Sequence, residues 1–176
     1  MRIDVGDLLK APTGEARAYQ VEDWELVVAE GAPPELVNGS ATLLRTPAGV
    51  LATAHLALHT WDACSRCLKE VDIPLEIGFE EEFLATVDVF TGTPLPKPEE
   101  PGAFVIDAQQ VLDLSEAVRQ YREIALPMQP LCGPDCAGLC PTCGRDLNME
   151  TCQCPQEPAD SRWSALAGLE RAVRNP

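Results

Sequence analysis

The sequence is poor in basic residues. Its 176 residues include 13 Lys and Arg against 28 Asp and Glu, which gives a formal net charge of −15 and a pI near 4.4. Proteins that bind nucleic acids or anionic membranes by electrostatics need basic side chains, because these release counterions from phosphates. The composition therefore argues against a generic nucleic-acid or membrane-surface binder.

Long apolar runs are also missing. No run approaches the roughly 18 residues that a membrane span needs, and residues 1–14 (MRIDVGDLLKAPTG) show no apolar core of a secretory signal. We therefore expect a cytoplasmic protein in a reducing environment. Leu, Val, Ile and Phe still make up about a quarter of the chain, above the roughly 20% below which highly charged chains stay disordered.

Familiar catalytic motifs are absent as well. The sequence contains no P-loop, no GxGxxG fingerprint and no GxSxG elbow. Its only histidines, His55 and His59, lack the glutamate of a zinc-protease motif, and we interpret them as surface or structural residues. We expect a protein that is not an enzyme and has no small-molecule substrate.

Alternating apolar residues predict β-strands in the first half of the chain. Residues 50–61 (VLATAHLALHTW) place Val, Ala and Leu on one face and polar residues on the other, as in a half-buried antiparallel strand. Residues 19–28, 41–45 and 71–80 are further strand candidates. Asn38-Gly39 predicts a turn, and Pro74 places its strand toward an edge.

Two helices are expected in the second half. Residues 113–125 (DLSEAVRQYREIA) have an apolar face of Leu114, Ala117, Val118, Tyr121 and Ala125; Asp113 and Glu116 fit a capping box, and Pro127 ends the helix. A C-terminal helix over 160–173 carries Trp163. The 16 prolines disfavour long helices.

These elements predict an α+β fold: a mostly antiparallel β unit, a central helix, a zinc-stabilised cysteine segment and a C-terminal helix. We divide the chain into a β-rich part (1–90), a proline-rich loop (91–102) and a C-terminal part (103–176), which together form one structural domain.

The eight cysteines fall into four close pairs. CxxC pairs allow two thiolates to bind one metal, and a glycine after the second cysteine permits the tight turn of a zinc knuckle. Tetrahedral zinc needs four ligands, so eight cysteines predict two structural zinc ions without an open catalytic position. The predicted ligands are Cys64, Cys67, Cys132, Cys136, Cys140, Cys143, Cys152 and Cys154.

The pairs can combine in three ways. Cys140/Cys143 with Cys152/Cys154 would close a short ribbon; Cys132/Cys136 with Cys140/Cys143 would form another local site. The third arrangement joins Cys64/Cys67 to Cys140/Cys143 and Cys132/Cys136 to Cys152/Cys154. We favour this third, stapled arrangement. Each arrangement gives Cys64/Cys67 partners some 65 residues or more away, so metal binding would close a long loop.

The cysteine segments resemble a known family. The similarity lies in Cys64-x-Arg-Cys67-Leu68, Leu131-Cys132, the run Cys136-x-Gly-Leu-Cys140-Pro-x-Cys143-Gly-x-Asp-Leu-Asn148 and Asp160-x-Arg162-Trp163. Together these motifs resemble the bacterial YceD family of large ribosomal RNA subunit accumulation proteins. The resemblance implies a cytoplasmic role in synthesis, processing or accumulation of 23S ribosomal RNA, without an assigned catalytic activity.

The acidic charge favours protein partners for such a role. We expect a ribosomal protein, a maturation factor or a pre-ribosomal particle, and leave direct RNA contact open. Arg66, Lys69 and the arginines of the C-terminal helix are candidates for phosphate contacts; Arg66 and Lys69 would equally balance thiolate charge. A zinc enzyme, a redox sensor at Cys64/Cys67 and a zinc-stabilised adaptor unrelated to ribosomes are the alternatives.

Overall fold

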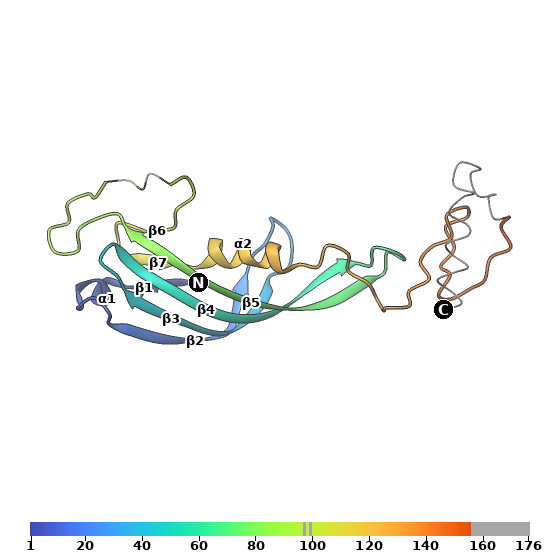
Figure 1. Ribbon diagram of the computed structural model, residues 1–176, viewed down its shortest axis with the longest axis horizontal. Helices are drawn as coiled ribbons and strands as arrows, with labels where there is room; N and C mark the ends of the chain where they lie inside the picture. The colour runs from blue at the N-terminus through green and yellow to red at the C-terminus, as the bar shows by residue number, and fades with distance from the viewer. Residues whose placement is uncertain (97, 99, 156–176) are drawn as a thin grey trace, which may run out of the picture.

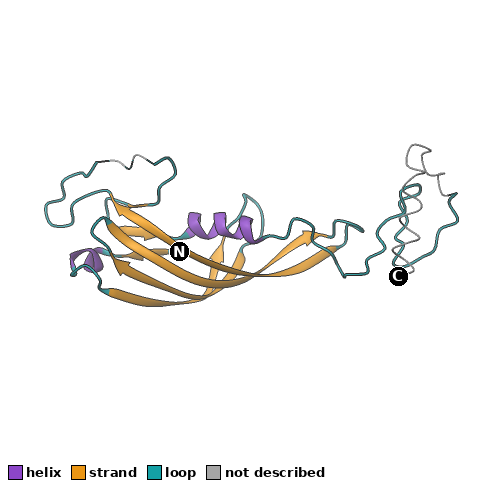
Figure 2. Cartoon of the chain, in the orientation of Figure 1, coloured by secondary structure: helices purple, strands orange, loops and turns teal. Residues whose placement is uncertain are grey.

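A computed structural model describes residues 1–96, 98 and 100–155. Within them the fold is α+β, as predicted, with mostly antiparallel strands and two helices (Figures 1 and 2). The predicted C-terminal helix lies outside the described residues. In chain order the elements are β1 (Arg2–Asp4), α1 (Gly6–Lys10), β2 (Ala16–Leu26), β3 (Glu35–Arg45), β4 (Gly49–Ala63), β5 (Glu70–Ala85), β6 (Val105–Ile106), β7 (Val111–Asp113) and α2 (Ser115–Ala125).

The main sheet has five strands in the order β2-β3-β4-β5-β6. Strands β2 to β5 form an antiparallel meander, and short β6 joins β5 in parallel at Leu84 and Ala85. Strands β1 and β7 form a separate two-stranded antiparallel sheet. In Figure 1 the β4–β5 hairpin extends beyond the other strands toward the cysteine segment.

Strand β4 confirms the predicted alternation. Val50, Ala52, Ala54, Leu56 and Leu58 are buried, whereas the histidines and Trp61 on the opposite face are exposed. Pro74 lies in β5 where this strand pairs only with β4, so its missing N–H is not needed by a second neighbour. We call the exposed side of β2–β5 the open face, and the side beneath α2 the inner face.

The Asn38-Gly39 turn prediction was wrong. Both residues lie inside β3, opposite a bulge in β2 between Val21 and Trp24. The Asn38 side chain accepts a hydrogen bond from the Asp23 backbone N–H, at 2.9 Å, and so stabilises the bulge. Gly39 has φ 145°, and a Cβ there would lie 2.2 Å from the His55 carbonyl oxygen. The glycine is required by close strand approach rather than by a turn.

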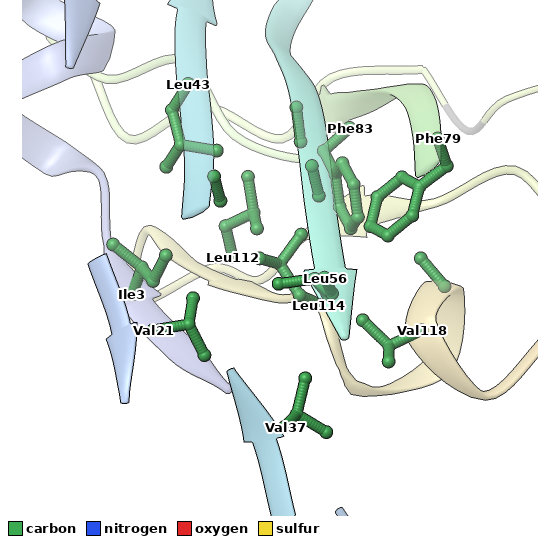
Figure 3. Packing of buried hydrophobic residues seen from close by; sticks show 14 of the residues in the cluster. Ile3, Val21, Val37, Leu43, Leu56, Phe79, Phe83, Leu112, Leu114 and Val118 are labelled. Carbon is green, nitrogen blue, oxygen red and sulfur yellow. The ribbon is translucent and has the colours of Figure 1, made fainter. Parts of the chain in front are cut away.

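The core lies between the inner face and α2, α1 and the β1–β7 pair (Figure 3). Leu114, just before α2, and Ala117 and Val118 of the helix are buried, and Tyr121 stacks on Phe79 of β5 with ring centroids 5.0 Å apart. A fully buried Leu or Phe contributes about 1.5–3 kcal/mol in such a layer. The predicted apolar face of the helix is therefore confirmed.

The start of α2 differs from the predicted capping box. Leu114 is the N-cap residue, and Asp113, the last residue of β7, accepts hydrogen bonds from the Ser115 backbone N–H and hydroxyl at 2.9 and 2.5 Å. Glu116 instead contacts Arg119 and Gln120 along the helix. Extended Leu126 ends α2 before Pro127, as predicted.

One buried ion pair fixes α2 to the sheet. The Arg122 guanidinium donates two hydrogen bonds of 2.6 Å to the Glu35 carboxylate of β3 and one of 2.7 Å to the Thr60 hydroxyl of β4. Burial alone would raise the pKa of Glu35, but the hydrogen bonds from Arg122 and Thr60 outweigh it and hold the pKa below its usual value. Because α2 leads directly into the cysteine segment, this pair also fixes where that segment begins.

Candidate metal centre

The eight cysteines form two groups of four. The first, which we call the bridging site, contains Cys64, Cys67, Cys132 and Cys136; the second, the local site, contains Cys140, Cys143, Cys152 and Cys154. Within each group the four Sγ atoms lie within 4.8 Å of one another. All eight predicted ligands are therefore placed in four-cysteine groups.

The stapled pairing that the sequence favoured was wrong. Cys64/Cys67 join Cys132/Cys136, and Cys140/Cys143 join Cys152/Cys154, which is the short-ribbon alternative. The Cys152-Gln-Cys154 pair, with one residue between its cysteines, supplies two of the four sulfurs of the local site. The bridging site still closes a long loop, since Cys67 and Cys132 are 65 residues apart.

The bridging site sits at the tip of the β4–β5 hairpin. Strand β4 ends at Ala63, and the next four residues turn so that the Cys64 backbone N–H bonds to the Lys69 carbonyl at 2.7 Å. Leu68 donates its N–H to the Cys64 carbonyl at 2.9 Å and adopts a left-handed φ of 61°. This is the backbone geometry of a zinc knuckle, with leucine where a glycine is common.

The other half of the bridging site comes from the chain after α2. The Pro130 carbonyl accepts a hydrogen bond of 2.8 Å from the Ser65 N–H at the hairpin tip. This contact brings Cys132 Sγ to 3.5 Å from Cys67 Sγ and Cys136 Sγ to 3.9 Å from Cys64 Sγ. Three of the four cysteines are buried, and Cys132 is exposed.

The local site repeats the same turn. The Cys140 N–H bonds to the Arg145 carbonyl, and the Gly144 N–H bonds to the Cys140 carbonyl, both at 2.8 Å. Gly144 has a φ of 70°, which matches Leu68 in the first turn. Cys152 Sγ lies 3.4 Å from Cys140 Sγ. Residue for residue, the two turns are equivalent.

The sulfur geometry fits a tetrahedral thiophilic metal. A Zn–S distance of about 2.3 Å implies S···S edges of about 3.8 Å in a regular tetrahedron, close to the observed 3.4 to 3.9 Å. A disulfide would need about 2.05 Å, and all eight cysteines are free. Four thiolates in a tetrahedron are typical of zinc or iron–sulfur ligation, and leave no coordination position for a substrate.

Backbone amides favour the thiolate of the first cysteine in each turn. The Cys67 N–H points at the Cys64 sulfur and lowers the pKa of Cys64 to about 6; the Cys143 and Thr142 N–H groups do the same for Cys140. In the second pair of each group, one thiol has a raised pKa because of a neighbouring sulfur. Cys136 raises the pKa of Cys132 to about 12, and Cys143 raises that of Cys154 to about 12. A bound cation would displace these remaining protons.

Arg66 and Lys69 make contacts within the cysteine region. The Arg66 guanidinium donates a hydrogen bond of 2.8 Å to the Cys136 carbonyl, and the Arg66 carbonyl accepts one of 3.1 Å from Leu139. Lys69 forms an ion pair with Asp146 at 2.9 Å, which raises the pKa of Lys69 and lowers that of Asp146. Both basic residues connect the two sites. Their contacts within the protein account for their positions without a phosphate ligand.

Sequence reasoning missed Asp146 and Asn148 as parts of the site. They lie between the two halves of the local site, yet Asn148 Nδ2 is 3.5 Å from Cys136 Sγ of the bridging site. Asn148 Oδ1 accepts a hydrogen bond of 2.7 Å from the Ala137 N–H. The motif Gly144-x-Asp-Leu-Asn148 could have predicted this role. Asp and Asn form turns, and beside metal ligands their side chains often hydrogen-bond to the groups around the metal.

The remaining candidates lie on the surface. His55 and His59 are exposed on the open face, as predicted, and His59 Nδ1 lies 2.9 Å from Asp72. Along β5 the open-face carboxylates Glu70, Asp72, Glu76, Glu80 and Glu82 are all exposed. The only basic residues of β2–β5, Arg17 and Arg45, pair with buried Leu43 and Val50 and so belong to the inner face. Apart from the two histidines, the ionisable side chains on the open face of these four strands are therefore acidic.

Fold and site together define an α+β protein with two four-cysteine groups suited to structural metal. Comparison with known proteins gives the family: residues 52–170, which include all eight cysteines, match the model of YceD, the large ribosomal RNA subunit accumulation protein. The chain belongs to the YceD family, as its cysteine motifs predicted.

Relatives are found in mycobacteria. An uncharacterised protein of Mycobacterium tuberculosis and one of Mycobacterium bovis are each 35% identical over 121 residues, which are 69% of this chain and 56% of theirs. One of Mycobacterium leprae is 28% identical over 145 residues, 82% of this chain and 63% of its own. This chain thus spans little more than half the length of these relatives. No solved structure matches it significantly, and no helix in the described part of the chain has the length and apolar character to cross a membrane.

Proposed function

We propose that this chain is a non-enzymatic cytoplasmic factor that supports accumulation of large-subunit ribosomal RNA and is stabilised by two structural zinc ions. The observation that carries the proposal is the family match, which covers both four-cysteine groups. Zinc is the proposed ion because four thiolates in a tetrahedron form a closed site that needs no redox chemistry. Absence of an open coordination position favours structural metal over catalysis.

Charge supports a basic protein partner, such as a ribosomal protein, within a pre-ribosomal particle. Five exposed carboxylates follow β5 on the open face, and no Lys or Arg of β2–β5 shares that face. Four thiolates per zinc ion leave each site with two further negative charges. Such a surface repels RNA phosphates and attracts basic polypeptides, which strengthens encounter more than it adds affinity.

Depletion of the protein tests the role. We expect large-subunit ribosomal RNA to fall relative to small-subunit RNA, and the protein to sediment with pre-ribosomal particles. Replacing Glu76 and Glu80 by lysine should weaken that association. The control Glu15→Lys with Glu30→Lys makes the same change in net charge away from the open face, and should leave the association unchanged. Unchanged ribosomal RNA and no particle association would contradict the proposal.

A redox sensor is the second candidate, favoured by the lowered pKa values of Cys64 and Cys140. Elemental analysis of the native protein separates the two. Two zinc ions per chain and thiols that resist mild oxidant support the structural role; metal-free protein whose Cys64 and Cys67 oxidise rapidly supports the sensor.

A further inference from the structure

Asn148 occupies a position that neither site explains alone. In the chain it lies between local-site ligands Cys143 and Cys152, but its side chain points at Cys136 of the bridging site, with 3.5 Å between Nδ2 and Sγ. Its amide orientation follows from its partners: Oδ1 faces the Ala137 N–H at 2.7 Å, so Nδ2 must face Cys136 and the Asp146 carboxylate. The group that meets the sulfur is a donor.

The loop that presents Asn148 is closed by the local site. Residues 144–151 connect Cys143 to Cys152, so an ion held by both halves would fix the two ends of this loop. Inside it, Asp146 Oδ1 accepts hydrogen bonds from the backbone N–H and the Nδ2 of Asn148, at 2.9 and 2.7 Å. Asn148 is thus held by hydrogen bonds within a loop whose two ends carry local-site cysteines.

The same loop touches the bridging site at two further points. The Leu147 N–H bonds to the Gly138 carbonyl at 2.9 Å, two residues after Cys136, and Asp146 pairs with Lys69, two residues after Cys67. These contacts position a cysteine-bearing segment from each half of the bridging site. An N–H donor to a metal-bound thiolate also stabilises its negative charge.

We propose that Asn148 couples the two sites, so that an ion at the local site raises the metal affinity of the bridging site. The local ion orders the loop, and the ordered loop supplies the donor to Cys136 and holds both halves of the bridging site. By linkage, an ion at the bridging site raises the affinity of the local site by the same factor. This inference rests on the proposed zinc binding but not on any ribosomal role. Loss of a comparable outer contact lowers metal affinity about 10- to 100-fold.

Zinc competition against chelators of graded affinity tests the coupling, with occupancy of each site read from alkylation of its own cysteines by mass spectrometry. We expect Asn148→Ala to lower zinc affinity of the bridging site about tenfold, with the alkylated peptides of the bridging site appearing first. Asn148→Asp should lower it further, because a carboxylate would face the thiolate. Met149→Ala is the matched control, since Met149 is the next residue and is 74% exposed.

Removal of one whole site completes the test. Cys152→Ser with Cys154→Ser should weaken zinc binding at the bridging site by a similar factor, and adding Asn148→Ala to this variant should change little more. Cys64→Ser with Cys67→Ser should weaken the local site equally. Circular dichroism identifies any variant whose sheet has not folded. Unaltered bridging-site affinity in Asn148→Ala, or an equal loss in Met149→Ala, would overturn the coupling. Two ions bound independently by the native protein would refute the coupling alone, whereas fewer than two bound ions would refute the proposed pair of zinc sites.

Discussion

The bridging and local sites share one knuckle geometry but join very different lengths of chain. Cys67 and its partner Cys132 are 65 residues apart, whereas Cys140 and Cys152 are 12 apart. In an unfolded chain, closing the longer loop costs about 1.5 kcal/mol more. In the folded protein, the strands and α2 have already closed it. An ion bound at the bridging site would therefore stabilise tertiary structure, whereas an ion at the local site would stabilise mainly a short ribbon.

The bridging site, which joins the more distant parts of the chain, is also the more buried of the two sites. Three bridging cysteines are buried, whereas only Cys140 of the local site is. The bridging site also covers the tip of a hairpin that extends beyond the other strands (Figure 1), where a two-stranded ribbon alone is marginally stable. The difference shows that one ligand set can serve as a tertiary clamp or as a local brace, depending on what its chain connects.

The largest expected effect breaks the clamp. Cys64→Ser should lower the free energy of unfolding by roughly 4 kcal/mol, because it removes a buried ligand and loosens the hairpin tip. Cys152→Ser is the matched change at the local site. It should cost about 1.4 kcal/mol, which is the equivalent of the tenfold loss of metal affinity that the coupling predicts at the bridging site. Urea unfolding followed by circular dichroism measures both. Equal losses would show that the two sites do not differ in this way.

The second prediction concerns the ion pair that fixes α2, the helix that leads into the bridging site, to the sheet. Arg122→Ala should destabilise the fold by about 3 kcal/mol, because it leaves the Glu35 carboxylate buried without its partner. Hydrogen exchange should rise at α2 and at residues 130–136 more than at the local site. Arg119→Ala, on the exposed side of the same helix, should leave exchange at residues 130–136 unchanged.

Acid should weaken the same ion pair by a smaller amount. The pKa of Glu35 is lowered in the folded protein, so its contribution to stability is complete above the unfolded value near 4.5 and disappears as the pH falls through the lower folded value. Glu35→Gln should therefore show a flatter loss of stability below pH 4.5 than the native chain. Parallel pH profiles of the two proteins, prepared without metal, would contradict the prediction.

The smallest effect compares the two turns at matching positions. Gly144→Ala should cost about 1 kcal/mol, because a Cβ is unfavourable at its left-handed φ, whereas Leu68→Gly should gain up to about 1 kcal/mol at the equivalent position. Zinc competition at each site gives both values. A loss on Leu68→Gly would mean that the leucine side chain contributes contacts that outweigh its backbone strain.

Period-2 and helical patterns predicted most of the sheet and α2. The sequence also predicted that the eight cysteines gather in two groups of four, because cysteine pairs at knuckle spacing are a local signal. Their pairing was not predictable, since it depends on where α2 delivers Cys132 relative to the hairpin tip. The turn predicted at Asn38-Gly39 was wrong for a similar reason. An Asn-Gly pair is typical of a turn, but here the same pair lies in a strand opposite a bulge. The Arg122–Glu35 pair joins residues 87 apart, and no local pattern contains such a contact.

The order of synthesis determines how long the first two cysteines of the bridging site must wait for the other two. Cys64 and Cys67 are synthesised long before Cys132, and at about 5 to 20 residues per second the 65-residue interval lasts roughly 3 to 13 seconds. The local site, in contrast, completes its ligands within about 1 to 3 seconds of its first cysteine. The bridging site nevertheless gains its last ligand, Cys136, 18 residues before the local site gains Cys154. Metal capture at the hairpin tip would therefore have to wait for residue 136 but not for the local site.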